Sequence, residues 1–492
     1  MQEGFLPPIH PRIPPTILTS RGNNLRQLAK QPLQKQVAKA VEVVSLRQSF
    51  IQEFEDFDDF IFRGEDIDSN AAAAVEHNLR LVRADLARIL WSNDVFIGID
   101  IIDRVLFDLV AAGQASTLVP SFLNFVQEKG IYRPGFVVYP LHSFGVLGLG
   151  FYRFFEKTLP HLTLPAAGLS ITAQTNSKEG AMSFLENTRI SFGIKQRLPD
   201  DILKHFMRSR PLSWIEHNPL MAVRVRSFTG TYYENQFIYM LKLRMSTALI
   251  MMLSVMEIRP DSDDRLTYGS TSRVNNWQTL DIKHYLTFET PIKHRSVLSA
   301  YCIPMNVAWL ELAMLSDLNV NIDPRAWTKA KAQKRLTSLY GTVSAIEKGF
   351  LQHSMLANGD ALRARVYRKM LTSVDYFRRS FSAGFRHSEA VVSLAIAFET
   401  LLTDFYAPGV TERILRRVRL CLKGVDGTRR FQAAVTNLFE CRGAIVHQGT
   451  AQELSTMTVA HQAYVLCLQH VVFRLSQLPK QGNDPIGQIL GD

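Results

Sequence analysis

The sequence predicts a mainly α-helical protein, in which an all-helical C-terminal part follows a larger N-terminal region of mixed α and β structure. From about residue 325 onward, apolar residues recur with the spacing of amphipathic helices. Residues 135–232 instead contain short β-branched and aromatic runs separated by Gly and Pro, which is typical of strands. With 492 residues, of which 46% are hydrophobic, the chain is long enough to bury more than one core.

We expect four segments along the chain. Residues 1–47 are proline-rich and then basic, which favours an extended arm ending in a short amphipathic helix, or alternatively a flexible tail. Residues 48–325 are expected to be helical at first and then mixed α+β. Residues 326–478 form the predicted helical domain, and residues 479–492 are expected to be a C-terminal tail.

The N-terminal region begins with an acidic and aromatic run at residues 50–68. Phe54, Phe57 and Phe60 fit one helical face, so we expect a helix that packs this face on the core and leaves its carboxylates in solvent. A metal site or a nucleic-acid mimic is a rarer explanation. The other elements expected here are helices over 72–130, a small sheet within 135–232, a helix at 234–257, a strand within 280–290 and helices again from about 296.

The charge of the chain favours polyanionic partners. The formal net charge is +11, which suits RNA, DNA or anionic lipid without choosing among them. Between Ala361 and Arg442 there are fifteen Lys or Arg and seven Asp or Glu, so this stretch supplies eight of the eleven surplus charges. The basic surface is therefore expected on the helical domain.

Cysteine usage and hydropathy suggest a cytoplasmic protein. The four cysteines lie far apart without a Cys-x-x-Cys pair, which favours a reducing compartment. The N-terminus lacks the apolar segment of a signal peptide. Two apolar runs, 134–152 and 237–258, are broken by Gly and Pro or by Lys242 and Arg244, so we expect no membrane span.

Arg442 interrupts an apolar helical stripe in the predicted helical domain. Helices are expected near 325–354, 360–382, 387–406, 411–423, 428–447 and 454–477. In the fifth of these, the stripe consists of Phe431, Val435, Leu438, Ile445 and Val446, and position 442 continues it. An arginine there either pairs with a buried carboxylate such as Glu399 or Glu440, extends its apolar stem along the stripe, or has a chemical role.

His447 follows Arg442 by five residues, in the expected last helical turn before Gly449. By itself it is explained as a histidine stabilised by the helix C-terminus. Five residues correspond to about 140° of rotation on an ideal helix. The two side chains therefore converge only if the helix ends or distorts there, or if a second subunit completes the site.

Two runs of the sequence resemble a known family. They are Glu389-Ala-Val-Val-Ser-Leu-Ala-Ile-Ala-Phe-Glu-Thr-Leu-Leu and Asn437-Leu-Phe-Glu-Cys-Arg-Gly-Ala-Ile-Val-His-Gln-Gly. Together they resemble the Apea-like branch of the HEPN ribonuclease superfamily, whose motif is Arg, four to six residues, then His. The resemblance covers about residues 330–478. It implies a HEPN helical bundle with Arg442 and His447 as the catalytic pair. We expect Glu399 and Glu440, the carboxylates that could pair with Arg442, to be supporting residues.

The resemblance implies a metal-independent endoribonuclease that acts as a homodimer. His suits proton transfer at the 2′-hydroxyl or the leaving 5′-oxygen, and Arg suits stabilisation of the phosphorane. Family members have abortive-infection and anti-phage roles, so we expect a toxin or defence effector whose N-terminal region senses an unknown trigger. No cofactor and no metal are expected. The residues expected to contact the RNA backbone are Arg413, Arg416, Arg417, Arg419 and Lys423. The alternative explanation of these five cations is that they form a solvated helix face without a ligand.

Two other functions remain open at this stage. The residue after the motif arginine is polar in many active HEPN nucleases and is Gly443 here, which supports a non-catalytic HEPN scaffold for dimerisation or nucleic-acid binding. A DNA-binding regulator that uses the basic arm and the basic helices is the third hypothesis.

Overall fold

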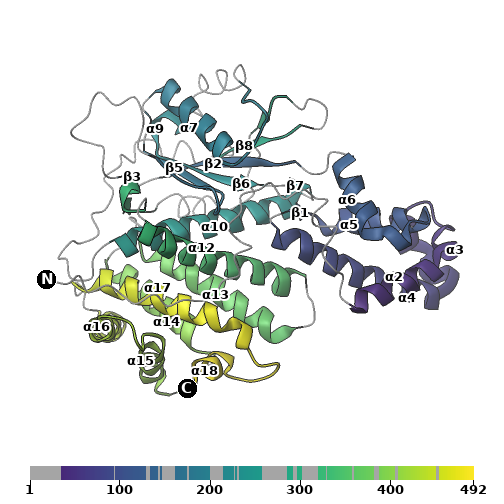
Figure 1. Cartoon of the computed structure of the whole chain (residues 1–492). Helices are drawn as coiled ribbons and strands as arrows, with labels where there is room; N and C mark the ends of the chain where they lie inside the picture. Colours follow the sequence, from purple (N-terminus) through teal and green to yellow (C-terminus); the bar gives the residue numbers. More distant parts are fainter. Residues whose placement is uncertain are drawn as a thin grey trace.

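The computed structural model of the chain describes residues 35–93, 95–128, 133–141, 144–146, 161–173, 175, 177–199, 214–225, 228–229, 232–257, 285–291, 296–301, 318, 320–327, 330–356, 360–381, 387–404, 408–449 and 454–492. A small sheet lies over a thick helical layer, and the N-terminal helices form a lobe beside both (Figure 1). The expected mainly helical architecture with a sheet between the N-terminal and C-terminal helices is confirmed.

The N-terminal lobe consists of α2 (Lys35–Leu46), α3 (Gln48–Ile51), α4 (Phe57–Ser92), α5 (Ile99–Ala111), a 3-10 turn (Ala115–Thr117) and α6 (Leu118–Glu128). Helix α2 is the expected amphipathic helix, with Val37, Ala40 and Val44 buried. The proline-rich part of the expected arm, residues 1–34, lies outside the described residues.

The aromatic run docks on the core as expected. Phe54 and Phe107 both pack against Phe60, each with ring centroids 5.3 Å apart. The run does not form one helix, however, because α4 starts only at Phe57, where the Asp56 side chain accepts a hydrogen bond from the Asp59 amide. The aromatic residues before α4 reach the same cluster from α3 and the turn that follows it.

The sheet has six strands in the order β4, β5, β6, β2, β8, β9, all antiparallel. They are β4 (His161–Leu164), β5 (Leu169–Thr172), β6 (Leu220–Val225), β2 (Gly135–Pro140), β8 (Leu286–Glu289) and β9 (Ser299–Tyr301). Two short parallel pairs lie outside it: β1 (Phe96–Ile97) with β7 (Phe228–Thr229), and β3 (Gly145–Val146) with β10 (Asn321–Ile322).

Both faces of the sheet are covered. In the central strand β2, Phe136 and Val138 pack into the smaller core with α7 (Lys178–Ser191) and α9 (Trp214–His217). The alternate residues Val137 and Tyr139 join the main core on the opposite face. This explains why the strand reads as a continuous apolar run, because neither face meets water.

Two expectations for this region have different outcomes. The strand within 280–290 is confirmed by β8. The helices expected from about 296 are wrong at residues 299–301, which form the edge strand β9 paired with β8. A three-residue strand is too short to show alternation, and its pairing partner determines its structure. Residues 302–317, where the rest of that prediction falls, lie outside the described residues.

The helical layer is built around α10 (Tyr232–Glu257), close to the helix expected at 234–257. It contacts β6 above and the C-terminal helices below (Figure 1). Thr247 of α10 accepts a 2.8 Å hydrogen bond from Arg378, and the Val255 carbonyl accepts a 3.0 Å bond from Gln462. A single hydrophobic core therefore runs across the boundary expected at residue 325.

The C-terminal helices begin and end close to their predicted positions. After a 3-10 turn (Pro324–Trp327) they are α12 (Ala330–Phe350) with a π turn (Leu351–Met355), α13 (Ala361–Arg379), α14 (His387–Leu402), α15 (Val410–Cys421), α16 (Thr428–Gln448), α17 (Met457–Arg474), a 3-10 turn (Leu475–Gln477) and α18 (Pro485–Leu490). Residues 479–492 were expected to be a tail, but they contain α18. Asp484 caps this helix, and Ile486, Ile489 and Leu490 are buried.

Candidate active site

Helix α16 carries both residues of the predicted catalytic pair. It is helical from Thr428 to Gln448 and ends at Gly449, which has a left-handed φ of 67°. Phe431, Val435 and Leu438 are buried, as the apolar stripe predicts. Val446, which we placed in the same stripe, is instead 50% exposed. It follows Ile445 directly, so its side chain is rotated by about 100° away from the buried face.

Arg442 lies half-buried where α16 packs against α14. Its Nη2 atom is 3.7 Å from Oε1 of Glu399, and the two side chains are 32% and 26% exposed. At this distance the guanidinium and the carboxylate form an ion pair but no hydrogen bond. The Nε atom of Arg442 is buried and has no hydrogen-bond partner among the described residues. The guanidinium is therefore held near a carboxylate while most of its donors stay uncommitted.

Glu399 and Glu440 differ in their relation to Arg442. Of the two carboxylates considered as partners, Glu399 forms the ion pair, because α14 faces this side of α16. Glu440 is exposed. Among the described residues, Arg442 has an ion pair with Glu399 alone. The explanation of Arg442 as a pairing residue thus has direct geometric support, and that support comes from Glu399.

His447 is exposed in the last turn of α16. Because the helix continues to Gln448, nothing at this end of α16 brings His447 around to the side of Arg442. The distortion that would make the two side chains converge within one chain is absent from α16 as described. Arg442 and His447 can therefore converge only if a second subunit completes the site.

Gly443 lies between them without a packing role. A Cβ atom built on this residue has nothing within 4 Å, so a larger side chain fits here. A glycine inside a helix costs roughly 1 kcal/mol relative to alanine. The space at Gly443 is thus open to the polar residue that the resemblance leads one to expect, although this chain does not have one.

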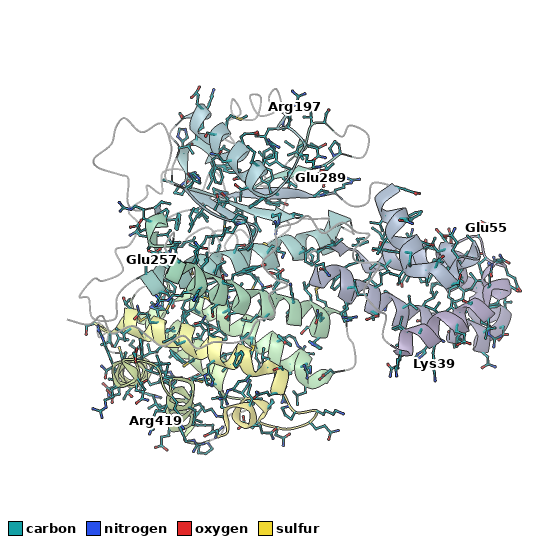
Figure 2. The ribbon with its side chains drawn as sticks, viewed as in Figure 1. Lys39, Glu55, Arg197, Glu257, Glu289 and Arg419 are labelled. Carbon is teal, nitrogen blue, oxygen red and sulfur yellow. The ribbon has the colours of Figure 1, made fainter. Side chains whose placement is uncertain are left out.

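Of the five cations expected to track RNA, four lie on α15 and Lys423 follows its C-terminal end, and they do not all face solvent. Arg419 and Lys423 are exposed, and Arg413 is half-buried. Figure 2 shows Arg419 at the outer edge of the helical layer, far from Arg197 and Glu289 near the sheet. Arg417, by contrast, is buried, which removes it from any nucleic-acid surface.

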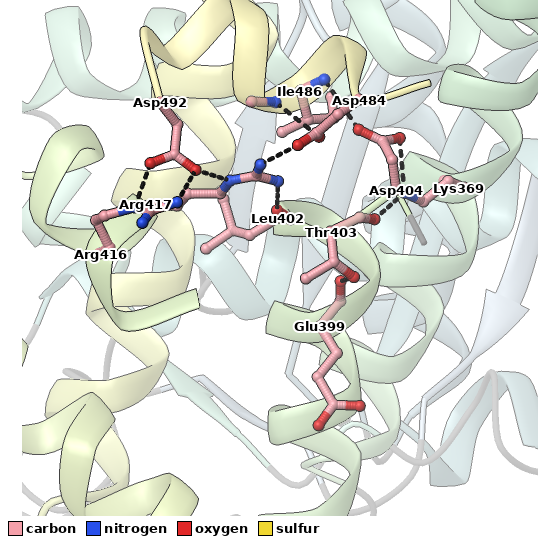
Figure 3. A network of polar contacts seen from close by, with 11 residues as sticks. Lys369, Glu399, Leu402, Thr403, Asp404, Arg416, Arg417, Asp484, Ile486 and Asp492 are labelled. Carbon is pink, nitrogen blue, oxygen red and sulfur yellow. Dashed lines mark hydrogen bonds and ion pairs between the residues drawn. The ribbon is translucent and has the colours of Figure 1, made fainter. Parts of the chain in front are cut away.

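Arg417 is the centre of a buried ionic network (Figure 3). It bonds to Asp492 at 2.7 Å, to the Leu402 carbonyl at 2.5 Å and, still more closely, to Asp484. Arg416 also binds Asp492 but keeps an exposed side chain. Hydrogen bonds from Arg416 hold the pKa of Asp492 below its ordinary value. These two arginines therefore attach the segment that contains α18 to α15.

A groove between α15 and α16 lies beside the exposed cations. Its volume is about 350 Å³, and Arg419 and Arg429 line its walls with Gln432 and Thr436. Arg429 was not among the predicted RNA-binding residues. The available signal was the Thr428-Arg429-Arg430 start of the helix, which places two more cations beside α15.

The described residues contain no group of three His, Cys, Asp or Glu side chains placed to bind a metal ion. Every helix in the described ranges is too short or too polar to cross a lipid bilayer. Models of protein families, curated proteins and solved structures give no significant match to the chain. The functional argument therefore rests on the residues themselves.

Proposed function

We propose that this chain is a metal-independent endoribonuclease of the HEPN type. In this proposal Arg442 and His447 are catalytic, and the protein is a cytoplasmic toxin or anti-phage effector whose N-terminal region responds to an unknown trigger. The observation that carries the proposal is the state of Arg442: a half-buried guanidinium on α16, with only a 3.7 Å ion pair to Glu399 and a buried Nε that has no hydrogen-bond partner.

The proposed chemistry needs one proton-transfer group and one cation. His447 takes the proton of the ribose 2′-hydroxyl as the hydroxyl oxygen attacks phosphorus. The bond to the 5′-oxygen breaks, and this leaving oxygen takes up a proton from water. The products are a 2′,3′-cyclic phosphate and a 5′-hydroxyl. Histidine is the residue type most often used for such proton transfers. Arg442 stabilises the extra charge of the phosphorane through its forked donors.

The proposal requires two copies of the chain. On one helix, Arg442 and His447 point about 140° apart, and α16 is regular over both residues. A two-fold pair of α16 helices would bring Arg442 of one copy toward His447 of the other. Val446, exposed beside His447, supplies apolar surface for such a contact.

The RNA path in this proposal follows the groove between α15 and α16. Arg419 and Arg429 present exposed cations in its lining, and Lys423 is an exposed cation just after the end of α15. Arg416 adds a partly engaged charge, because it also binds Asp492. Contacts of this kind bind the phosphate backbone with strong salt dependence and little sequence preference. Arg417 is left out of the proposed path, since it is buried.

The decisive experiment is cleavage of total cellular RNA in EDTA by wild type and by His447→Ala. His447 is exposed, so its replacement should leave the fold intact. His77→Ala, an exposed histidine on α4, is the matched control. Cleavage that leaves 2′,3′-cyclic phosphate ends, that His447→Ala abolishes and that His77→Ala retains is the expected result. Equal cleavage by all three proteins would contradict the proposal.

A non-catalytic scaffold is the second candidate, and the Arg442–Glu399 ion pair favours it. A paired arginine between two helices is a sufficient structural reason for the residue. Under this alternative, wild type and His447→Ala bind RNA equally and neither cleaves it. Expression of the two proteins in cells adds a separate readout, because only a nuclease predicts toxicity that His447→Ala removes.

A further inference from the structure

A second basic groove lies at the other end of the helical layer. It has a volume of about 790 Å³ and lies between the first turns of α13 and the segment at residues 480–482. Its walls are formed by Asp360, Ala361, Leu362, Arg365 and Arg368 on one side and by Lys480, Gln481 and Gly482 on the other. Small-molecule sites commonly have volumes of roughly 300–1,000 Å³. The groove is thus large enough for a nucleotide.

The charged side chains of this groove are mostly cations that form no ion pair within the described residues. None of Arg365, Arg368 and Lys480 forms an ion pair with a carboxylate of the described residues. Arg368 reaches only the Ala364 carbonyl one turn back, at 3.3 Å. The one carboxylate in the lining, Asp360, is engaged by Arg363, whose amide and Nε lie 2.9 and 3.0 Å from its oxygens. Three cations therefore face the groove with little to neutralise them.

The wall opposite α13 is attached to the helical layer by one exposed hydrogen bond and several part-buried polar contacts. Arg365 donates a 3.3 Å hydrogen bond to the Gly482 carbonyl across the groove. Two residues further on, Asp484 binds the buried Arg417, and the Ile486 amide donates to Asp404 at 3.0 Å (Figure 3). Asp404 in turn pairs with Lys369 of α13 at 3.0 Å. Both walls are tied to one network, so the backbone segments that carry these cations are held together before a ligand binds.

This groove is distinct from the candidate active site. His447 lies at the end of α16, just before α17 begins, whereas residues 480–482 follow the end of α17. An 18-residue helix such as α17 spans about 27 Å. Figure 1 shows the yellow segment that leads into α18 at the opposite end of α17 from α16. A ligand in the groove is therefore far from His447 of the same copy.

We propose that this groove binds the phosphate groups of a nucleotide. Arg365 and Arg368, one turn apart on α13, bind the phosphates from one side, and Lys480 binds them from the other. Arginine and lysine donors match phosphate oxygens in geometry and charge. Ala361 and Leu362 supply a small apolar surface in the same lining for the base. The same chemistry would hold a phosphate of single-stranded RNA, which the experiment separates from a free nucleotide.

The test is binding of a fluorescent N-methylanthraniloyl ATP to the full chain. Arg368→Glu and Lys480→Glu each reverse one charge, on opposite walls, and both residues are exposed. Arg365 is left unchanged because it also bonds to Gly482. Arg379→Glu, exposed at the other end of α13, is the matched control. We expect a dissociation constant raised about tenfold or more by each groove variant and left within about twofold by the control.

Competition identifies the ligand class. Unlabelled ATP should displace the probe, and adenosine, which lacks phosphate, should not. Displacement by decauridylate at lower phosphate concentration than ATP assigns the groove to RNA, and the reverse assigns it to a free nucleotide. The proposal is overturned if wild type fails to bind the probe, if all variants bind it equally, or if adenosine competes as well as ATP. None of these results depends on RNA cleavage, so the proposed nuclease can fail while this site stands.

Discussion

The guanidinium of Arg442 lies 3.7 Å from the carboxylate of Glu399, across the contact between α16 and α14. The contact is half-exposed and lacks hydrogen-bond geometry. A pair of this kind contributes roughly 0–1 kcal/mol to folding. Because the ion pair contributes so little to stability, a substitution of Arg442 can test its role in catalysis without unfolding the protein.

Arg442→Gln should therefore remove RNA cleavage without unfolding the protein. We expect a rate at least about 100-fold lower, as for the loss of a donor to a developing anion. The free energy of unfolding should fall by no more than about 1 kcal/mol. Urea denaturation and cleavage assays on the same preparation check both. A stable variant with full activity would remove Arg442 from the proposed mechanism.

Mixed dimers should report which chain supplies each residue. If each site uses Arg442 of one copy and His447 of the other, a dimer of Arg442→Ala with His447→Ala retains one intact site of two. Random mixing of equal amounts should then restore about a quarter of wild-type activity. Either variant alone is inactive and is the control. An inactive mixture would place both residues of each site on the same copy.

Gly443→Ala should stabilise the protein. The residue is in the interior of α16, and a Cβ atom there meets nothing within 4 Å. We expect a gain of roughly 0.5–1 kcal/mol in the free energy of unfolding, from helix propensity alone. Thermal denaturation of wild type and the variant measures it. Because the glycine has no packing role, a destabilised variant would show that another chain covers this face.

Arg417 and Arg419 should respond in opposite ways to replacement by alanine. Arg417→Ala leaves Asp484 and Asp492 without their buried partner and should cost about 3–5 kcal/mol. Arg419→Ala, at an exposed position, should leave stability unchanged. It should weaken RNA binding and reduce the slope of binding against salt by about one. Chemical denaturation and binding at several salt concentrations distinguish the two effects.

Glu257 should make stability fall as pH rises. Burial raises its pKa from 4.5 to about 8, although its oxygens accept bonds from Trp327 and the Asp323 amide. The folded chain then holds a proton that the unfolded chain releases, so this stability is complete below pH 4.5 and is lost up to about pH 8. The loss is at most about 5 kcal/mol. Glu257→Gln should flatten this slope in melting curves at pH 5.5 and 8.5.

Most of the C-terminal helices could be predicted because they bury one apolar face, and the six segments expected from about residue 325 onward lie close to α12–α17. The position of Arg442 in a stripe was readable for the same reason. Arg417 shares that signal, since Ile414, Val418 and Cys421 form the stripe around it. The cluster of arginines around Arg417 predicts a charged surface, whereas its helical position between Ile414, Val418 and Cys421 predicts burial.

Features formed by residues far apart in the chain could not be predicted from the sequence. Asp484 and Asp492 lie 67 and 75 residues from Arg417 in sequence, and nothing local predicts that they bind it. The edge strand β9 and the short helix α18 are stabilised by the partners they pack on. The groove at α13 joins Arg365 to Gly482, which are 117 residues apart. Sequence periodicity describes one element at a time and gives no information on such pairings.

Helix α10 decides how any control by the N-terminal region can be studied. It touches β6 on one side and α12, α13 and α17 on the other. A fragment that begins after residue 300 would leave the apolar surfaces of these three helices bare to water. Such a fragment would aggregate, and its lack of RNA cleavage would give no information about regulation. Communication from the sheet to the helices is better traced by single replacements along α10, which leave the assembled chain intact.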